Sequence, residues 1–125
     1  MRLNHLDLHV ADVAKTRNFF VTHFGLRHLE TRGDDGLAIL QDNAGLELVI
    51  SRPIAKLGGA DQTALGCVTY HIGFLLPSRN EVDALYARLV VANVELAAAP
   101  RAMRGGWAFY VTAPGNILVE VSSRI

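Results

Sequence analysis

The feature that most constrains the fold of this chain is an internal repeat. One order of elements (strand, helix, then three strands) occurs twice in its 125 residues. Apolar and polar residues alternate over 3–10 and again over 69–76, and this alternation predicts the first strand of each copy. The repeat predicts an α+β fold of two βαβββ modules, residues 1–51 and 68–123, joined by a linker at 52–67.

The first copy has clear signals for both ends of its helix. Asp12 is a natural N-cap, because its carboxylate can accept hydrogen bonds from the free amides of the first turn. Gly25 suits the left-handed residue that ends a helix, so we expect the helix over 13–24. The three remaining strands of this copy are expected at 26–31, 37–41 and 46–51.

The second copy repeats these signals with different residues. Ser78 and Glu81 form a capping box, in which each side chain can satisfy an amide at the start of the helix. Asn93 can end that helix, and the turn at 113–116 suits type II, with Pro second and Gly third. The strands after this helix are expected at 94–99, 107–112 and 117–122.

Composition excludes several classes of protein. Half of the residues are apolar and the formal net charge is zero, which argues against a disordered chain and against a general nucleic-acid-binding surface. A single cysteine excludes an internal disulfide framework and fits a reducing compartment. The chain shows no apolar run suited to a signal peptide or a membrane span, so we expect a cytoplasmic globular protein without a membrane partner.

Each copy places a histidine and a carboxylate on the strand face that points away from the predicted core. His5 and His71 lie in the first strands, and Glu47 and Glu120 lie in the last strands. If the first and last strands of a copy are neighbours, these residues form two His/Glu pairs. Two imidazoles and two carboxylates suit one divalent ion such as Zn, Ni, Mn or Fe. Any one of the four taken alone would ordinarily be a solvated side chain.

Two further polar residues share the face of the first strand that carries His5. His9 suits either a contact with a substrate or a plain lining of the cavity. Asp7 lies between the two histidines, where it could orient a ligand imidazole or simply be solvated.

Residues 3–12, 18–26 and 113–120 resemble the vicinal oxygen chelate superfamily. That group includes glyoxalase I, fosfomycin-modifying enzymes, extradiol dioxygenases, epimerases and bleomycin-resistance proteins, and the resemblance extends over residues 1–123. It implies paired βαβββ modules whose mixed sheets curl around a metal-binding cavity, with the helices on the outer face. The metal ligands of the family fall on His5, Glu47, His71 and Glu120.

The four-ligand set is most similar to that of glyoxalase I. This resemblance implies a metal-dependent lyase or isomerase that acts through a chelated enediolate, with Glu47 or Glu120 moving the proton. His9 stands where glyoxalase I has an arginine that helps to hold glutathione, and Ser51 stands where it has an asparagine, so glutathione is not implied.

Other members of the family imply other functions. A fosfomycin-type thiol transferase would use His5, His71 and Glu120 as ligands, and a ring-cleaving dioxygenase would use the same three as its iron triad. A bleomycin-resistance-type protein would instead bind a planar drug between aromatic residues without a metal. Its platform could come from Trp107, Phe109 and Tyr110, which are otherwise core residues of one strand.

The resemblance also implies a substrate loop and a dimer. Residues 99–106 correspond to a segment that borders the cavity mouth, and Arg101 and Arg104 there suit a carboxylate or phosphonate on a small substrate. Solvated arginines on a flexible loop are the ordinary alternative. Related short chains commonly share each site between two subunits, so we expect a homodimer in which His5 and Glu47 come from one chain.

Overall fold

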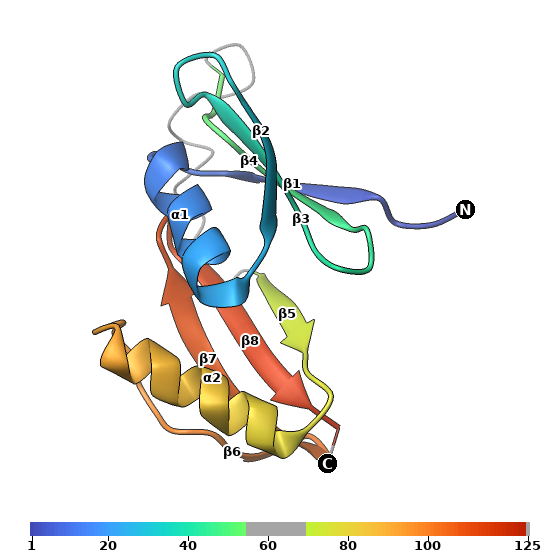
Figure 1. Ribbon diagram of the computed structural model, residues 1–125, viewed down its shortest axis with the longest axis vertical. Helices are drawn as coiled ribbons and strands as arrows, with labels where there is room; N and C mark the ends of the chain where they lie inside the picture. Colours follow the sequence, from blue (N-terminus) through green and yellow to red (C-terminus); the bar gives the residue numbers. More distant parts are fainter. Residues whose placement is uncertain (55–69, 125) are drawn as a thin grey trace. The chain divides into compact units, whose positions relative to one another are not determined.

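The computed structural model describes residues 1–54 and 70–124, and it divides into two compact units, Met1–Leu65 and Gly66–Ile125. Each unit contains one α-helix and one four-stranded mixed sheet (Figure 1). The predicted α+β fold of two βαβββ modules is confirmed. The predicted linker at 52–67 lies outside the described residues, apart from residues 52–54.

The sheet of the first unit has the strand order β1-β4-β3-β2. Its first and last strands are parallel neighbours, which meets the condition for a His/Glu pair, and its other strand pairs are antiparallel. The elements of this unit are β1 (His5–His9), α1 (Val13–Phe24), β2 (Arg27–Arg32), β3 (Leu37–Gln41) and β4 (Glu47–Ser51).

Helix α1 begins and ends at the predicted residues. The Asp12 carboxylate accepts a hydrogen bond from the Lys15 amide at 3.0 Å, and Gly25 adopts a left-handed conformation with φ 66. Phe20 is fully buried, and it makes an edge-to-face contact with Phe19. The apolar face of α1 therefore supplies the centre of this unit's core.

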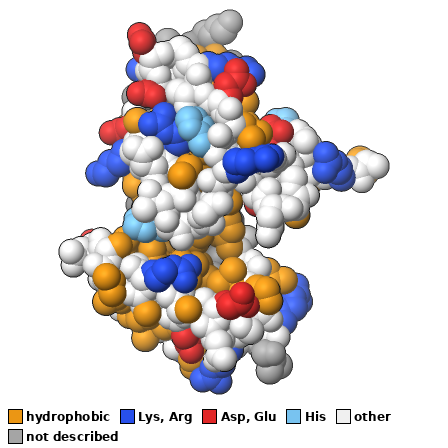
Figure 2. All heavy atoms as spheres, viewed as in Figure 1, with side chains coloured by type: hydrophobic (Ala, Val, Ile, Leu, Met, Phe, Trp, Pro, Cys, Tyr) orange, Lys and Arg blue, Asp and Glu red, His pale blue; other side chains and the backbone are white. Residues whose placement is uncertain are grey.

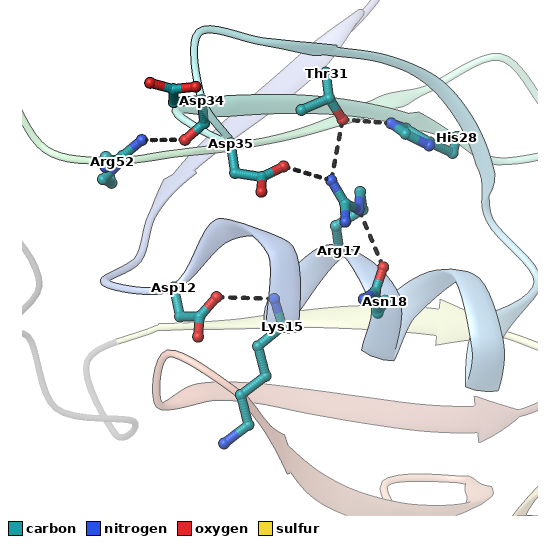
Figure 3. Close-up of polar contacts among 9 residues, drawn as sticks. All are labelled: Asp12, Lys15, Arg17, Asn18, His28, Thr31, Asp34, Asp35 and Arg52. Atoms are coloured by element: carbon teal, nitrogen blue, oxygen red, sulfur yellow. Dashed lines mark hydrogen bonds and ion pairs between the residues drawn. The ribbon is translucent and has the colours of Figure 1, made fainter.

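A polar network joins α1 to the hairpin formed by β2 and β3 (Figure 3). The Arg17 guanidinium donates to Thr31 Oγ1 at 3.2 Å and to Asp35 Oδ1 at 3.0 Å. The same threonine hydroxyl also lies 2.6 Å from His28 Nε2. The Arg17 side chain is only 17% exposed. Its contacts therefore connect α1 to the β2–β3 hairpin in a largely buried position.

The sheet of the second unit has the equivalent strand order, β5-β8-β7-β6. Again the first and last strands are parallel neighbours and the other pairs are antiparallel. The elements are β5 (His71–Leu75), α2 (Arg79–Val91), β6 (Arg101–Met103), β7 (Gly106–Ala113) and β8 (Ile117–Ser123).

Helix α2 is capped at both predicted positions. The Ser78 hydroxyl oxygen accepts from the Glu81 amide at 3.2 Å. The Glu81 carboxylate, however, accepts from the Ser78 hydroxyl at 3.0 Å, so the box closes through the two side chains. Asn93 ends the helix with φ 58, and the amide of Val94 then bonds to the Leu89 carbonyl at 3.0 Å.

The strand predicted at 94–99 is wrong. These residues belong to no strand, and the sheet is completed by β6, which starts after Pro100 and pairs antiparallel with β7. Three alanines at 97–99 favour strand structure weakly, and Pro100 has no amide to donate to a ladder. The alternation of Val94 and Leu96 therefore reflects partial burial without strand pairing.

The core of each unit lies between its helix and one face of its sheet. In the first unit Val10, Leu40 and Ile50 are fully buried, whereas Leu6, which the alternation places in the core, is 37% exposed. Charges of both signs are scattered over the visible surface without either dominating (Figure 2), in line with the zero net charge. Neither described helix is long and apolar enough to cross a membrane.

Candidate metal centre

His71 and Glu120 lie side by side on the face of the second sheet that points away from α2. The register pairs Glu120 with Gly73, so His71 is its diagonal neighbour across the parallel β5–β8 ladder. The His71 Nε2 atom lies 3.4 Å from Glu120 Oε2. Two ligands of a tetrahedral zinc ion are about 3.4 Å apart when each bond is about 2.0–2.2 Å long. The separation of this pair therefore suits two ligands of one ion.

Glu120 Oε2 also accepts hydrogen bonds from two other side chains. The Tyr110 hydroxyl donates to it at 2.7 Å, and Arg104 Nη2 donates to it at 2.9 Å. The Arg104 guanidinium contacts the Tyr110 hydroxyl as well, which closes a three-residue cluster. Such a charge-assisted cluster fixes the position of the carboxylate.

Tyr110 has a perturbed acidity for the same reason. Donation of its proton to the Glu120 carboxylate is the main cause that raises the pKa of Tyr110 above its ordinary value of 10.0, and burial and the negative charge of Glu120 add to it. Tyr110 therefore remains a neutral hydrogen-bond donor at physiological pH.

His5 and Glu47 lie on the equivalent strands of the first unit, β1 and β4. They are direct register partners across the parallel β1–β4 ladder, so their side chains leave the sheet on one face. His5 Nδ1 lies 3.0 Å from Asn4 Oδ1. In the tautomer that donates this hydrogen bond, Nε2 keeps the lone pair that a metal requires. None of the four predicted ligands is buried in a helix-facing core.

Asp7 and His9 lie on the same face of β1 as His5. The Asp7 carboxylate accepts a short hydrogen bond from Ser51 Oγ, at 2.6 Å, and His9 is the register partner of Ser51. The partner of Asp7 is thus a serine of the neighbouring strand, which neither interpretation of the sequence anticipated.

Of the two predicted substrate arginines, the structure brings Arg104 to Glu120. Arg101 begins β6 opposite Ala108, on the same face of the sheet as Tyr110, and its side chain is exposed. Arg104 follows β6 in a tight turn and points back to Glu120. A pocket of about 360 Å³ adjoins this cluster, and its lining includes Met103, Arg104, Glu120 and Ser122.

Trp107 lies on the opposite face of β7, toward α2. Its indole Nε1 donates to Asp83 Oδ1 at 2.7 Å, and the Arg79 guanidinium lies 3.4 Å from the ring centroid. Phe109 is fully buried on that same side. Of the three aromatic residues proposed as a platform, the structure therefore brings only Tyr110 to Glu120.

Sequence reasoning missed the pairing of Tyr110 with Glu120, although a signal was present. The β7–β8 hairpin aligns Ala113 with Ile117 across its turn, and counting three residues away from the turn on each strand aligns Tyr110 with Glu120. Since adjacent residues of a strand point to opposite faces, this alignment would also have placed Phe109 on the face away from Glu120.

Each unit thus places one predicted imidazole ligand and one predicted carboxylate ligand on one face of its sheet, and these donor types fit a divalent transition ion. Within residues 1–54 and 70–124, no group of three or more His, Cys, Asp or Glu side chains is close enough to hold a metal.

Comparison with known proteins agrees with this architecture. The family model described as Glyoxalase/Bleomycin resistance protein/Dioxygenase superfamily matches residues 2–121. A solved structure of a possible glyoxalase from Bacillus cereus is 32% identical, covers 97% of each chain and superposes with a TM-score of 0.79. No curated protein matches the sequence.

Two other solved structures extend the comparison. The fosfomycin resistance protein FosX from Listeria monocytogenes is 25% identical over 98% of this chain and 90% of its own, with a TM-score of 0.75. A lactoylglutathione lyase from Agrobacterium tumefaciens is 17% identical over 98% and 92%, with a TM-score of 0.77, and at that identity it shows similarity of fold alone.

Proposed function

Because the chain belongs to the glyoxalase/bleomycin resistance protein/dioxygenase superfamily, we propose that it is a divalent-metal-dependent enzyme of glyoxalase type, a lyase or isomerase. The observation that carries the proposal is the repeated His/carboxylate pair. In one module His71 Nε2 lies 3.4 Å from Glu120 Oε2, and in the other His5 and Glu47 are register partners. The proposal joins these four residues in one centre.

The two glutamates are suited to different tasks. A divalent ion held by this set would supply Lewis-acid stabilisation of negative charge on two adjacent substrate oxygens. Three side chains converge on Oε2 of Glu120, which makes it a fixed group. Within the described residues no hydrogen bond or ion pair holds the Glu47 side chain. We therefore assign proton transfer at the substrate carbon to Glu47 first and to Glu120 second.

The surrounding residues favour a small anionic substrate. Arg104 puts a guanidinium group into the lining of a pocket of about 360 Å³, and such a group binds two carboxylate or phosphonate oxygens at once. Arg101 is a second predicted anion-binding residue, exposed at the start of β6. His9 contributes a ring nitrogen that can donate or accept a hydrogen bond on the face of β1 that carries His5. Trp107 is a predicted substrate contact as well, although its indole hydrogen bond to Asp83 of α2 directs it to the opposite face of its sheet.

Metal content of protein purified without a metal-affinity tag tests the proposal. We expect one divalent ion per four-residue centre, and near-complete loss of it in the His5→Ala/His71→Ala double variant. The His23→Ala/His28→Ala double variant removes two histidines of α1 and β2 and should retain the metal. A wild-type protein that is folded yet binds no Zn²⁺, Ni²⁺, Mn²⁺ or Fe²⁺ would exclude this function and would favour a metal-free drug-binding protein.

A fosfomycin-type transferase is the second candidate. The observation in its favour is the Arg104 guanidinium beside Glu120, because a phosphonate group suits an arginine fork. The FosX protein of Listeria monocytogenes also covers nearly the whole chain. The Glu47→Gln variant separates the two candidates. It should abolish isomerase activity on a hemithioacetal but leave thiol addition to fosfomycin largely intact.

We further propose a homodimer in which His5 and Glu47 of one chain meet His71 and Glu120 of its mate. Refolding His5→Ala together with Glu120→Ala tests this arrangement. With shared sites a mixed dimer collects both defects in one site, leaves the other intact and regains part of the metal binding. With sites inside each chain every site keeps one defect, and nothing returns. The single cysteine supports a reducing, cytoplasmic setting for this enzyme.

A further inference from the structure

Arg104 forms a hydrogen bond with the carboxylate oxygen of Glu120 that a metal ion would need as a ligand. Its Nη2 donates to Glu120 Oε2 at 2.9 Å, and His71 Nε2 lies 3.4 Å from that same oxygen. A divalent cation bound between His71 and Glu120 would therefore have the guanidinium as a direct neighbour. Two positive groups on one carboxylate oxygen repel each other strongly at such a distance.

The position of Arg104 allows it to leave. Its side chain is 64% exposed, whereas the Glu120 side chain is 19% exposed, so the guanidinium is the mobile member of the pair. It extends from a tight turn in which Arg104 has φ 49 and Gly105 has φ 76. Its departure would break its contacts with Glu120 and Tyr110 without uncovering a core residue.

The pocket beside the cluster offers the released side chain a new role. Arg104 lines this pocket of about 360 Å³ together with the polar residue Ser122. While Arg104 pairs with Glu120, its charge is neutralised and its donors are partly used. Once released, its planar fork can bind a carboxylate or phosphonate.

We propose that Arg104 is a displaceable internal counterion that couples metal loading to the binding of an anionic substrate group. It neutralises Glu120 in the metal-free protein, and it becomes a binding group for the substrate when the metal takes its place. This inference rests on the proposed metal centre, and it makes anion binding depend on prior metal binding. By thermodynamic reciprocity, a bound anion must in turn strengthen metal binding by the same factor. Removal of Arg104 must also strengthen metal binding, because the metal no longer has to displace a competing positive charge.

Calorimetric titration of Zn²⁺ into the metal-free protein tests the first half. We expect the Arg104→Ala variant to bind Zn²⁺ about tenfold more tightly than the wild type, because one competing positive charge has gone. Arg88→Ala is the matched control. It removes an equal charge from the exposed surface of α2 in the same unit, and no ion pair joins Arg88 to Glu120 among the described residues, so its effect should stay within about twofold.

Titration with methylphosphonate tests the second half. The wild type should bind this anion more tightly in the presence of Zn²⁺, by about tenfold, and Arg104→Ala should lose most of that gain. Equal Zn²⁺ affinity in the wild type and Arg104→Ala would overturn the inference and leave the metal centre standing. A failure of all three proteins to bind Zn²⁺ would overturn the inference and the metal centre together.

Discussion

Tyr110 and Glu120 lie directly opposite each other in the β7–β8 hairpin, and the phenol donates to the carboxylate at 2.7 Å. The register of the hairpin therefore sets where Glu120 points. Because His71 contacts the same oxygen from the other neighbouring strand, the central strand β8 presents Glu120 to partners on both sides.

We predict that Tyr110 titrates above the ordinary tyrosine pKa of 10.0. Its pKa is raised chiefly by the hydrogen bond to Glu120, so Glu120→Gln should return the pKa of Tyr110 toward 10.0. The folded-state value exceeds the unfolded one, so this bond stabilises the fold fully below the unfolded pKa. That stabilisation is lost as the pH rises through the folded pKa. Ultraviolet difference titration measures the shift, and Tyr110→Phe identifies the transition by removing it.

We predict that Arg17→Ala lowers the free energy of unfolding by about 1 kcal/mol, since it removes hydrogen bonds that join α1 to the β2–β3 hairpin. Urea denaturation measures the change. Arg88→Ala removes an exposed arginine from α2 and serves as the control. A double-mutant cycle with Asp35→Ala should give a positive coupling energy, and a coupling of zero would contradict a direct contribution of the ion pair.

We predict that Gly106→Ala is strongly destabilising, by about 2 kcal/mol or more. A Cβ atom on Gly106 would overlap the backbone carbonyl oxygen of Ser123, which the β7–β8 ladder holds in place. Gly73→Ala is the matched control, because its added Cβ would meet its nearest atom at 3.9 Å. Thermal unfolding of both variants should separate them clearly, and similar melting temperatures would contradict the close approach at Gly106.

We predict that Trp107 supports the packing of α2 and not the metal. Trp107→Phe removes the indole hydrogen bond to Asp83 and should cost about 1 kcal/mol of stability while metal content stays unchanged. Trp107 is the single tryptophan of the chain, so the fluorescence of Asp83→Ala reports directly on this contact. Loss of metal in a folded Trp107→Phe protein would contradict this assignment.

The sequence by itself determined the repeat, both helices and most strands, because these depend on near neighbours. Asp12, Gly25, Ser78 and Asn93 cap the helices at the predicted positions. The alternation of apolar and polar residues wrongly predicted a strand at 94–99. A strand forms only where its backbone pairs with another strand, and the pairing with β7 begins at Arg101, after Pro100. The family resemblance, which rested on residues 3–12, 18–26 and 113–120, is confirmed by the family model that matches residues 2–121.

Only the tertiary structure decided what surrounds the candidate ligands. Arg104 and Glu120 are 16 residues apart, and Trp107 and Asp83 are 24 apart, so no local pattern specifies either contact. The turn after β6 directs Arg104 onto the carboxylate, and the strand's alternation turns Trp107 away from it. Such contacts depend on the register of strands and on the path of the turn between them. Near-neighbour preferences carry too little of that information to predict them.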